Sequence, residues 1–297
     1  MAELQNILIT GAASGIGRAT AIRMARRMHV IAADRDRDGA AALVEELKRD
    51  GHSASAVAVD VASRASVAEM MAWIGANVGP VHALFSNAGI NLRHPIEEIT
   101  EEEWDRMMAV HPKGAYLCCQ AVLPQMIARK SGAIVTTSSD FAVQGVAGYI
   151  TYTAAKAAIY SLTKSLAVEF AAHGIRVNAV GPGPIDTPLL RFGRPPEEWG
   201  ATLARNASRV PMGRLGRPEE VASLVDFLVS ERSSYITGQI IHPRKDAAVG
   251  CDDRILRIKH VERCRTIVGV DDHLNAVPHV VDEVAVETVM GRVRIAV

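Results

Sequence analysis

The sequence predicts a doubly wound α/β domain built on a parallel β-sheet. Short apolar runs alternate along the chain with longer segments of helical pattern. The apolar runs lack the polar alternation of strands that face water on one side, so we expect both faces of the sheet to be covered. Parallel strands need long crossover connections, which the helical segments supply. No repeat or low-complexity linker interrupts residues 1–242, which we interpret as one domain.

The elements follow one another regularly as far as residue 187. We expect strands at residues 6–10, 29–34, 53–60, 82–89, 132–139, 175–183 and 238–242. We expect helices at residues 16–28, up to 48, 67–78, 101–129, 150–172 and 218–229. Residues 188–210 break the rhythm, and we interpret them as a substrate lid with Phe192 and Trp199 as its apolar contacts. An ordinary surface excursion is the alternative.

The bulk composition indicates a globular protein with no special affinity for polyanions. The chain has 297 residues, of which 48% are hydrophobic, enough for one large core. Lys and Arg together number 33, as do Asp and Glu, so nothing favours nucleic acid or an anionic membrane. No apolar stretch approaches the ~20 residues of a membrane-spanning helix. The start "MAELQNILITG" lacks a signal-peptide pattern, and the four cysteines lack a disulfide framework, so we expect a cytoplasmic protein.

The chain changes character from residue 243. Residues 243–297 contain no Phe, Trp or Tyr, and "VAVETVMGRVRIAV" alternates apolar and polar residues on both sides of Gly291, which predicts a short hairpin. Cys251, His260, Cys264 and His273 match no zinc-binding spacing, so we predict no metal site. This stretch is either a genuine extension or the translation of a shifted reading frame.

A glycine-rich turn in "ILITGAASGIGRAT" predicts a dinucleotide site of the Rossmann type. Gly11 permits the tight turn, Gly15 lets the backbone approach a phosphate, and Gly17 allows close packing of helix on strand. The exposed amides at the start of the helix can then hold a pyrophosphate.

The end of the second strand bears on which dinucleotide binds. The carboxylate of Asp34 can accept both ribose hydroxyls of an adenosine and would repel a 2′-phosphate. Arg35 and Arg37 favour the opposite choice, since an arginine there can pair with such a phosphate. Because Ser14, which precedes Gly15, is not basic, we expect NAD(H) rather than NADP(H).

Tyr152 and Lys156 in "YITYTAAK" are four residues apart and share one face of a helix. A phenol titrates near ~10, so catalysis near neutrality needs roughly 3 units of depression, about 4 kcal/mol. An ammonium about 5 Å away, at an effective dielectric near 20, supplies roughly 3 kcal/mol of this. The pair can therefore do chemistry, although a lysine snorkelling past a packed tyrosine is the ordinary interpretation of such a spacing.

Several motifs occur together in a fixed order. They are "TGAASGIG", "SNAG" at residues 86–89, Ser139, "YTAAK" at residues 152–156 and "VGPGPIDTP" at residues 180–188. Together they resemble the short-chain dehydrogenase/reductase family over residues 4 to about 242. The resemblance turns the Tyr152–Lys156 pair into a catalytic prediction.

The resemblance implies a role for each motif residue. Tyr152 would be the acid–base residue, and Lys156 would lower its pKa and bind the nicotinamide ribose. Ser139, favoured over Ser138 by its offset from Tyr152, would hydrogen-bond the substrate oxygen. The implied cofactor-binding residues are Gly11, Ser14, Gly15, Ile16, Gly17, Asp34, Asp60, Val61, Asn87, Gly89, Tyr152, Lys156, Pro182, Gly183, Ile185 and Thr187.

Three positions depart from the family's usual pattern. His111 stands where the family usually has an asparagine that holds a water at a helix kink, and Pro112 would supply the kink here. His111 either relays a proton through that water or merely fills space. Residues 27–29 lack the usual glycine at the end of the first helix, so we expect local strain. Pro243 should end the last strand, because proline cannot donate to a strand ladder.

We therefore expect an NAD-dependent oxidoreductase that interconverts a secondary alcohol and a ketone, with the catalytic residues Ser139, Tyr152, Lys156 and His111. The substrate would be small or medium-sized, such as a polyol, hydroxy acid or cyclic alcohol, in a pocket shaped by the lid and by Asp140, Gln144, Val146 and Tyr149. Two alternatives stay open: an NAD(H)-binding protein with little turnover, and a reductase of 3-oxoacyl thioesters. The resemblance also implies a homo-oligomer, a tetramer or dimer, which the altered C-terminus makes less secure.

Overall fold

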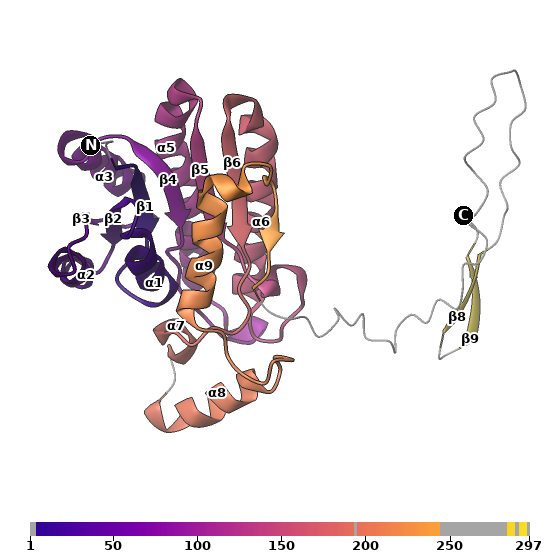
Figure 1. Cartoon of the computed structure of the whole chain (residues 1–297). Coiled ribbons are helices and arrows are strands. Elements are labelled where there is room, and N and C mark those ends of the chain that lie inside the picture. The colour runs from indigo at the N-terminus through magenta and orange to yellow at the C-terminus, as the bar shows by residue number, and fades with distance from the viewer. Residues whose placement is uncertain (1–3, 193–194, 244–283, 289–290, 296–297) are drawn as a thin grey trace, which may run out of the picture. The chain divides into compact units, whose positions relative to one another are not determined.

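The computed structural model describes residues 4–192, 195–243, 284–288 and 291–295. Its internal contacts divide the chain into two units, Met1–Lys245 and Asp246–Val297. The first unit contains a seven-stranded parallel sheet with the strand order β3-β2-β1-β4-β5-β6-β7 (Figure 1). This is the order of a doubly wound dinucleotide-binding sheet with one further edge strand. The predicted fold class is confirmed.

The strands and helices follow the sequence prediction, with shorter strand ends. The strands of the sheet are β1 (Asn6–Thr10), β2 (His29–Asp34), β3 (Ala54–Ala58), β4 (Val81–Ser86), β5 (Gly132–Thr137), β6 (Ile175–Val180) and β7 (Ile240–Ile241). The helices that cover it include α1 (Gly15–Met24), α2 (Arg37–Arg49), α3 (Arg64–Asn77), α5 (Gly114–Arg129), α6 (Ile150–Phe170) and α9 (Pro218–Val229). Several predicted strands end early because their last residues leave the sheet as loops at its carboxyl edge.

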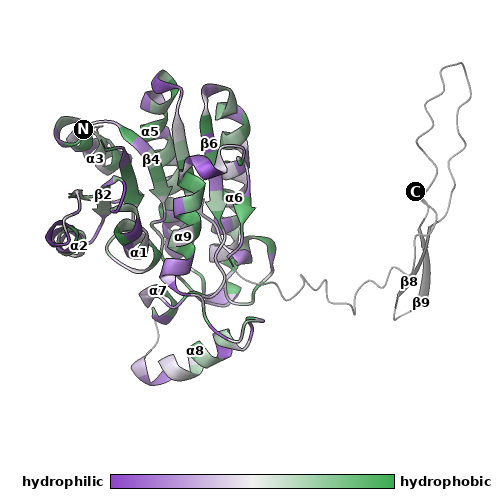
Figure 2. Ribbon diagram, in the orientation of Figure 1, coloured by the Kyte–Doolittle hydropathy of each residue, from purple (hydrophilic) through white to green (hydrophobic). Residues whose placement is uncertain are grey.

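Two hydrophobic layers enclose the sheet, one on each face. Along β1, the side chains of Ile7 and Ile9 pack in one cluster with residues of α1, α2 and α9. Leu8 points the other way, into a second cluster with residues of α3 and α5. Burying each such side chain contributes roughly 1.5–3 kcal/mol. Figure 2 shows the resulting hydrophobic colouring along the central strands, and two-sided burial explains why the strands carry no polar alternation.

The helix expected over residues 101–129 is interrupted in its middle. It begins as α4 (Glu101–Met108), passes through a π-helical turn at Ala109–Lys113, and continues as α5. Pro112 lies in this turn, where it removes one backbone donor and prevents regular α-helical hydrogen bonding. The predicted kink is present, and it turns the buried side chain of His111 toward the carboxyl edge of the sheet.

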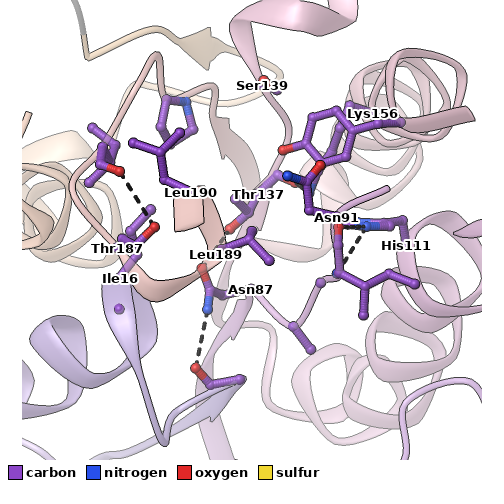
Figure 3. A pocket seen from close by; sticks show the side chains of 18 of the residues that line it. Ile16, Asn87, Asn91, His111, Thr137, Ser139, Lys156, Thr187, Leu189 and Leu190 are labelled. Carbon is purple, nitrogen blue, oxygen red and sulfur yellow. Dashed lines mark hydrogen bonds between the residues drawn. The ribbon is translucent and has the colours of Figure 1, made fainter. Parts of the chain in front are cut away.

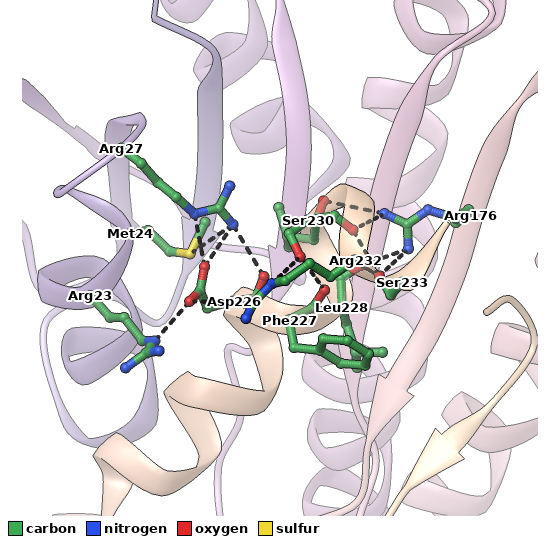
Figure 4. A network of polar contacts seen from close by, with 11 residues as sticks. Arg23, Met24, Arg27, Arg176, Asp226, Phe227, Leu228, Ser230, Arg232 and Ser233 are labelled. Atoms are coloured by element: carbon green, nitrogen blue, oxygen red, sulfur yellow. Dashed lines mark hydrogen bonds and ion pairs between the residues drawn. The ribbon is translucent and has the colours of Figure 1, made fainter. Parts of the chain in front are cut away.

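The connection from α1 to β2 does not contain the strain expected at residues 27–29. No residue there has a positive φ, and backbone hydrogen bonds from Arg27 and Met28 to the carbonyl of Met24 close the turn. Arg27 and Arg23 then bind the carboxylate of Asp226 on α9, at 2.7 and 3.0 Å (Figure 4). The expectation of strain was wrong because α1 ends earlier than expected and two arginines tie its end to α9.

The segment at residues 188–210, which we call the lid segment, contains α7 (Pro188–Arg191), a 3-10 turn (Pro196–Glu198) and α8 (Trp199–Ala207). The stretches of chain just before and just after this segment are joined by backbone hydrogen bonds. The Asp186 amide donates to the Gly216 carbonyl at 2.9 Å, and the Gly216 amide donates to the Pro184 carbonyl at 3.0 Å. The lid segment is therefore an excursion from a closed neck, Pro184–Asp186 against Gly216.

The last strand of the sheet, β7, ends at Ile241, two residues before Pro243, as expected. In the second unit, β8 (Val284–Thr288) and β9 (Gly291–Ile295) form an antiparallel pair. The predicted hairpin is confirmed. Cys251, His260, Cys264 and His273 lie outside the described residues.

Candidate active site

A cavity of about 450 Å³ opens at the carboxyl ends of β1, β4, β5 and β6. Its size suits a small-molecule site, and its place is the usual ligand crevice of an open α/β sheet. Figure 3 shows Ser139, Lys156 and His111 on one side of it, with Ile16 and Thr187 on the other. Of the predicted site residues, the structure brings the following to the cavity wall: Gly11, Ser14, Gly15, Ile16, Asp34, Asp60, Val61, Asn87, Gly89, His111, Ser139, Tyr152, Lys156, Pro182, Gly183, Ile185 and Thr187.

Gly17 is the predicted cofactor residue that does not line this cavity. A Cβ at Gly17 would lie 1.9 Å from the carbonyl oxygen of Gly11, and a Cβ at Gly11 would lie 2.9 Å from the Cα of Ala88. Gly17 therefore lets α1 pack against the turn. The N-cap residue Ser14 makes no side-chain capping bond, which leaves the first amides of α1 available to an anion.

The carboxylate of Asp34 is held at the end of β2 by main-chain donors. Its Oδ2 accepts the amide of Ala13 at 2.9 Å, and its Oδ1 accepts the amide of Asp36 at 2.9 Å. These bonds fix the negative charge at the cavity wall next to the glycine turn. Arg35 also lines the cavity.

Asn87 joins the ends of three strands. Its Nδ2 donates to the carbonyls of Thr10 and Gly11, and its Oδ1 accepts from the hydroxyl of Thr137. The carbonyl of Thr137 in turn accepts a bond of 2.8 Å from Nζ of Lys156. Thr137 was missed in the sequence because its role depends on contacts between residues far apart in the chain.

Lys156 is 3% exposed, and its Nζ lies 5.5 Å from the centre of the Tyr152 ring. Burial lowers the pKa of Lys156 to about 7. Burial also raises the pKa of Tyr152, with the Asp140 charge adding to the rise and a hydrogen bond with Ser139 opposing it. Desolvation is the largest of these causes, so the buried phenol is held in its protonated form.

The two neighbouring serines have different partners. The hydroxyl of Ser138 donates to the backbone carbonyl of Lys156 in α6, at 3.0 Å. The Oγ of Ser139 accepts the amide of Phe141 at 3.1 Å and donates to Oδ1 of Asp140 at 3.0 Å, beside the phenol of Tyr152. This arrangement supports Ser139 rather than Ser138 as the substrate-facing hydroxyl.

His111 is 1% exposed and packs edge-on against the ring of Tyr152, with ring centres 5.6 Å apart. Its Nε2 lies 2.9 Å from the carbonyl and 3.2 Å from the amide of Ile90, whereas its buried Nδ1 has no protein partner among the described residues. Burial and the charge of Lys156 hold the pKa of His111 well below its usual value. A Cβ at Gly89 would lie 2.6 Å from the imidazole, so the loop there needs glycine. His111 is thus a neutral ring with one open nitrogen.

The substrate end of the cavity differs in part from the expected set. Asp140, Tyr149 and Phe192 line it, together with Asn91, Leu189, Leu190 and Asn206. Gln144, Val146 and Trp199 do not line it. Of the two apolar contacts predicted for the lid segment, Phe192 therefore lines the cavity and Trp199 does not. The ring of Trp199 lies 5.9 Å from the guanidinium of Arg191.

The described part of the chain contains no group of three or more His, Cys, Asp and Glu side chains placed to hold a metal ion. Within the same ranges, no helix has the length and apolarity to cross a membrane. Cys118 and Cys119 are buried, free thiols, and burial raises the pKa of Cys118 to about 12.

The chain is similar to proteins of known class. Residues 11–243 match the model of a family described as enoyl-(acyl carrier protein) reductase. The chain is 39% identical over 235 residues to the 3-oxoacyl-[acyl-carrier-protein] reductase FabG of Thermotoga maritima, covering 79% of this chain and 94% of that protein. It is 42% identical over 235 residues to the cis-4-hydroxycyclohexanecarboxylate dehydrogenase of Sinomonas cyclohexanicum, covering 79% of this chain and 92% of that protein.

Solved structures agree with these relatives. A short-chain type dehydrogenase/reductase from Mycobacterium marinum has a TM-score of 0.75 and 33% identity, over 80% of this chain and 93% of that one. A second solved structure is that of a protein from Beutenbergia cavernae, provisionally described as an NAD(P)-dependent gluconate 5-dehydrogenase with NADP bound at low occupancy. It has a TM-score of 0.75 and 34% identity, over 80% of this chain and 94% of that one. These matches, with the sheet order and the residues gathered at the cavity, show that this chain belongs to the short-chain dehydrogenase/reductase family of nicotinamide-dependent oxidoreductases.

Proposed function

We propose that the chain transfers a hydride between NAD(H) and a small or medium-sized secondary alcohol or ketone, and that Tyr152 is its acid–base residue. The observation that carries this proposal is the meeting of Ser139, Tyr152 and Lys156 at one wall of a cavity that also contains the glycine turn. The glycines that a Cβ would block, and the uncapped amides of α1, suit a dinucleotide pyrophosphate.

Each side chain of the site has its own role in this proposal. The nicotinamide supplies the hydride chemistry when bound. A phenol with a raised pKa stays protonated at neutral pH, so Tyr152 can donate its proton to a carbonyl oxygen during reduction. Lys156, tied to the carbonyl of Thr137, lies beside the phenol, and its protonated form would favour the ionised phenol during oxidation. Ser139 holds the substrate oxygen beside that phenol.

The Tyr152→Phe variant tests the acid–base role. It should lose at least about 100-fold in kcat on a panel of secondary alcohols, because proton transfer contributes this much or more. Its affinity for NADH, followed by cofactor fluorescence, should stay within about twofold. If wild type and variant are equally inert over the panel but bind NADH alike, the chain is an NAD(H)-binding protein with little turnover.

We propose NAD(H) as the preferred cofactor over NADP(H). The proposal rests on the fixed carboxylate of Asp34 at the cavity wall, which would repel a 2′-phosphate. Arg35 and the relative with NADP bound make NADP(H) the competing choice. The Asp34→Ala variant should relax the ratio of kcat/KM values for the two cofactors toward NADP⁺. An unchanged ratio would refute the assigned contact.

Reduction of a 3-oxoacyl thioester is the second candidate. It is favoured by the similarity to reductases named for that reaction in Thermotoga maritima and Staphylococcus epidermidis. Acetoacetyl-coenzyme A, offered with NADH and with NADPH beside the alcohol panel, separates the two candidates. A kcat/KM for the thioester above that of every alcohol and ketone would favour the second.

The remaining assignments are also proposals. We propose that residues 1–242 form the catalytic domain, that His111 holds a water through Nδ1, and that the protein acts in the cytoplasm as a homo-oligomer. Light scattering of the purified full chain tests the last point, and a mass corresponding to 31.9 kDa would reject it.

A further inference from the structure

We propose that the site takes a neutral polyol, such as a cyclic polyol, and that the side-chain amides of Asn91 and Asn206 hold its hydroxyl groups away from the reacting carbon. The inference rests on the proposed function and narrows its substrate class. A simple secondary alcohol, which has no further hydroxyl, would leave both amides without a partner.

Asn91 brings a free amide to the active-site cavity. It lines the cavity from the loop after β4, and Figure 3 shows it on the same side as Lys156 and His111. Its side chain makes no hydrogen bond within the described part of the chain. The preceding residue is anchored, because Nε2 of His111 lies 2.9 Å from the carbonyl of Ile90. Asn91 therefore offers a ligand both a donor and an acceptor from a held position.

Asn206 lines the same cavity from α8 of the lid segment. Its Nδ2 donates to the backbone carbonyl of Thr202, one helical turn earlier, at 2.8 Å. This bond uses one of the two Nδ2 protons and sets the orientation of the amide. The oxygen Oδ1 and the second proton of Asn206 stay available to a ligand.

Hydroxyl groups match these two amides better than other oxygen groups do. Each amide presents a carbonyl oxygen, which only accepts, and an N–H, which only donates. A hydroxyl pairs with either, whereas a ketone or an ionised carboxylate pairs with the N–H alone. Because the amides are uncharged, they also give a carboxylate no ionic attraction. Asn91 and Asn206 thus favour a neutral ligand with several hydroxyls.

Apolar side chains line the same end of the cavity and suit the carbon skeleton of a ring. Leu189, Leu190 and Phe192 lie there, together with Tyr149. A cyclic polyol has C–H faces that pack on such side chains and a rim of hydroxyls that can reach the amides. A ring without these hydroxyls would displace water from the amides without replacing its hydrogen bonds.

The test compares ligands with one six-membered ring: cyclohexanol and a panel of cyclohexanediols and inositols. In wild type, kcat/KM for at least one polyol should exceed that for cyclohexanol by about 10-fold or more, since an unmade hydrogen bond costs about this factor. Asn91→Leu and Asn206→Leu, which keep the side-chain size, should each lower the ratio for that polyol by about fivefold or more. The ratio cancels any effect common to all ligands.

Asn77→Leu is the matched control. Asn77 at the end of α3 makes the same local bond as Asn206, from Nδ2 to the carbonyl of Trp73 four residues earlier, also at 2.8 Å. It is exposed and does not line the cavity. The control variant should therefore keep the wild-type ratio.

Equilibrium binding of the same ligands to the NADH-loaded protein, followed by cofactor fluorescence, gives a readout that needs no turnover. Tighter binding of a polyol, weakened in both leucine variants, would support the inference even without turnover, and the absence of turnover would then refute the proposed function alone. If no polyol binds or reacts better than cyclohexanol, the inference is overturned. A leucine variant that keeps the wild-type ratio would overturn the role of that amide.

Discussion

The two ends of the cavity are built by different means. At the cofactor end, the main chain does most of the work: glycines allow close approach, amides of α1 stay uncapped, and Asp34 is held by two backbone donors. At the substrate end, buried side chains from separate segments meet, with His111 on the π-helical turn and Lys156 on α6. The cofactor end depends on glycines that leave room for close approach of the main chain. The substrate end depends on how burial changes the charge of its side chains.

The largest effect on stability and cofactor affinity should follow from adding a side chain to a glycine at the cofactor end. In Gly17→Ala the new Cβ would meet the carbonyl of Gly11 at 1.9 Å, so α1 must shift away from the turn. We expect a loss of about 1–3 kcal/mol in the free energy of unfolding and at least about a tenfold loss of NADH affinity. Denaturant titration and cofactor fluorescence measure the two.

Gly75→Ala on α3 is the matched control, because nothing lies within 4 Å of its added Cβ. It should raise stability by about 0.5–1 kcal/mol and leave NADH affinity unchanged. Equal behaviour of the two alanine variants would show that the turn tolerates a side chain, and the contrast between the two ends of the cavity would fail.

At the substrate end, the buried Lys156 should make stability depend on pH. Its pKa is lowered to about 7 in the folded protein, so above that pH the unfolded chain binds a proton that the folded one does not. The free energy of unfolding should therefore rise with pH from about 7 toward about 10, by up to about 1.4 kcal/mol per unit.

Lys156→Met should lack this rise, while Lys164→Met, an exposed position on the same helix, should keep it. Urea denaturation between pH 7 and 9 without cofactor gives the comparison. Parallel stability curves for wild type and Lys156→Met would mean that the lysine titrates normally in the folded protein.

A smaller effect should separate the two readings of His111. If its open Nδ1 holds a water near Lys156, His111→Asn should retain kcat within about threefold, whereas His111→Leu should lose about 10- to 100-fold and shift the pH profile of kcat. Steady-state kinetics across pH 6–9 measures both. Wild-type kinetics in the leucine variant would leave His111 as a space-filling residue.

The fold could be predicted from sequence because its signals are local and periodic. The strands read as apolar runs since both faces are buried, and the glycine turn falls between a strand and a helix. The hairpin around Gly291 followed from alternation alone.

What the sequence could not supply depends on distant contacts and on burial. The connection after α1 is relaxed because Arg27 meets Asp226, some 200 positions along the chain. The effect of burial on Tyr152 and Lys156 was also out of reach, because desolvation, the largest cause of both pKa shifts, depends on the residues that the fold packs around them. Trp199 was assigned to the cavity by its apolarity, although Leu190 and Phe192 at the start of the lid segment line it instead.

The closed neck between Pro184–Asp186 and Gly216 has a consequence for how such a protein can diversify. Because the two backbone bonds at the neck hold its ends together, residues between them can be lengthened, shortened or replaced without altering any strand register. Natural variation can therefore replace the lid segment as a unit. Such a replacement would change which molecules enter the cavity, while the sheet keeps its architecture.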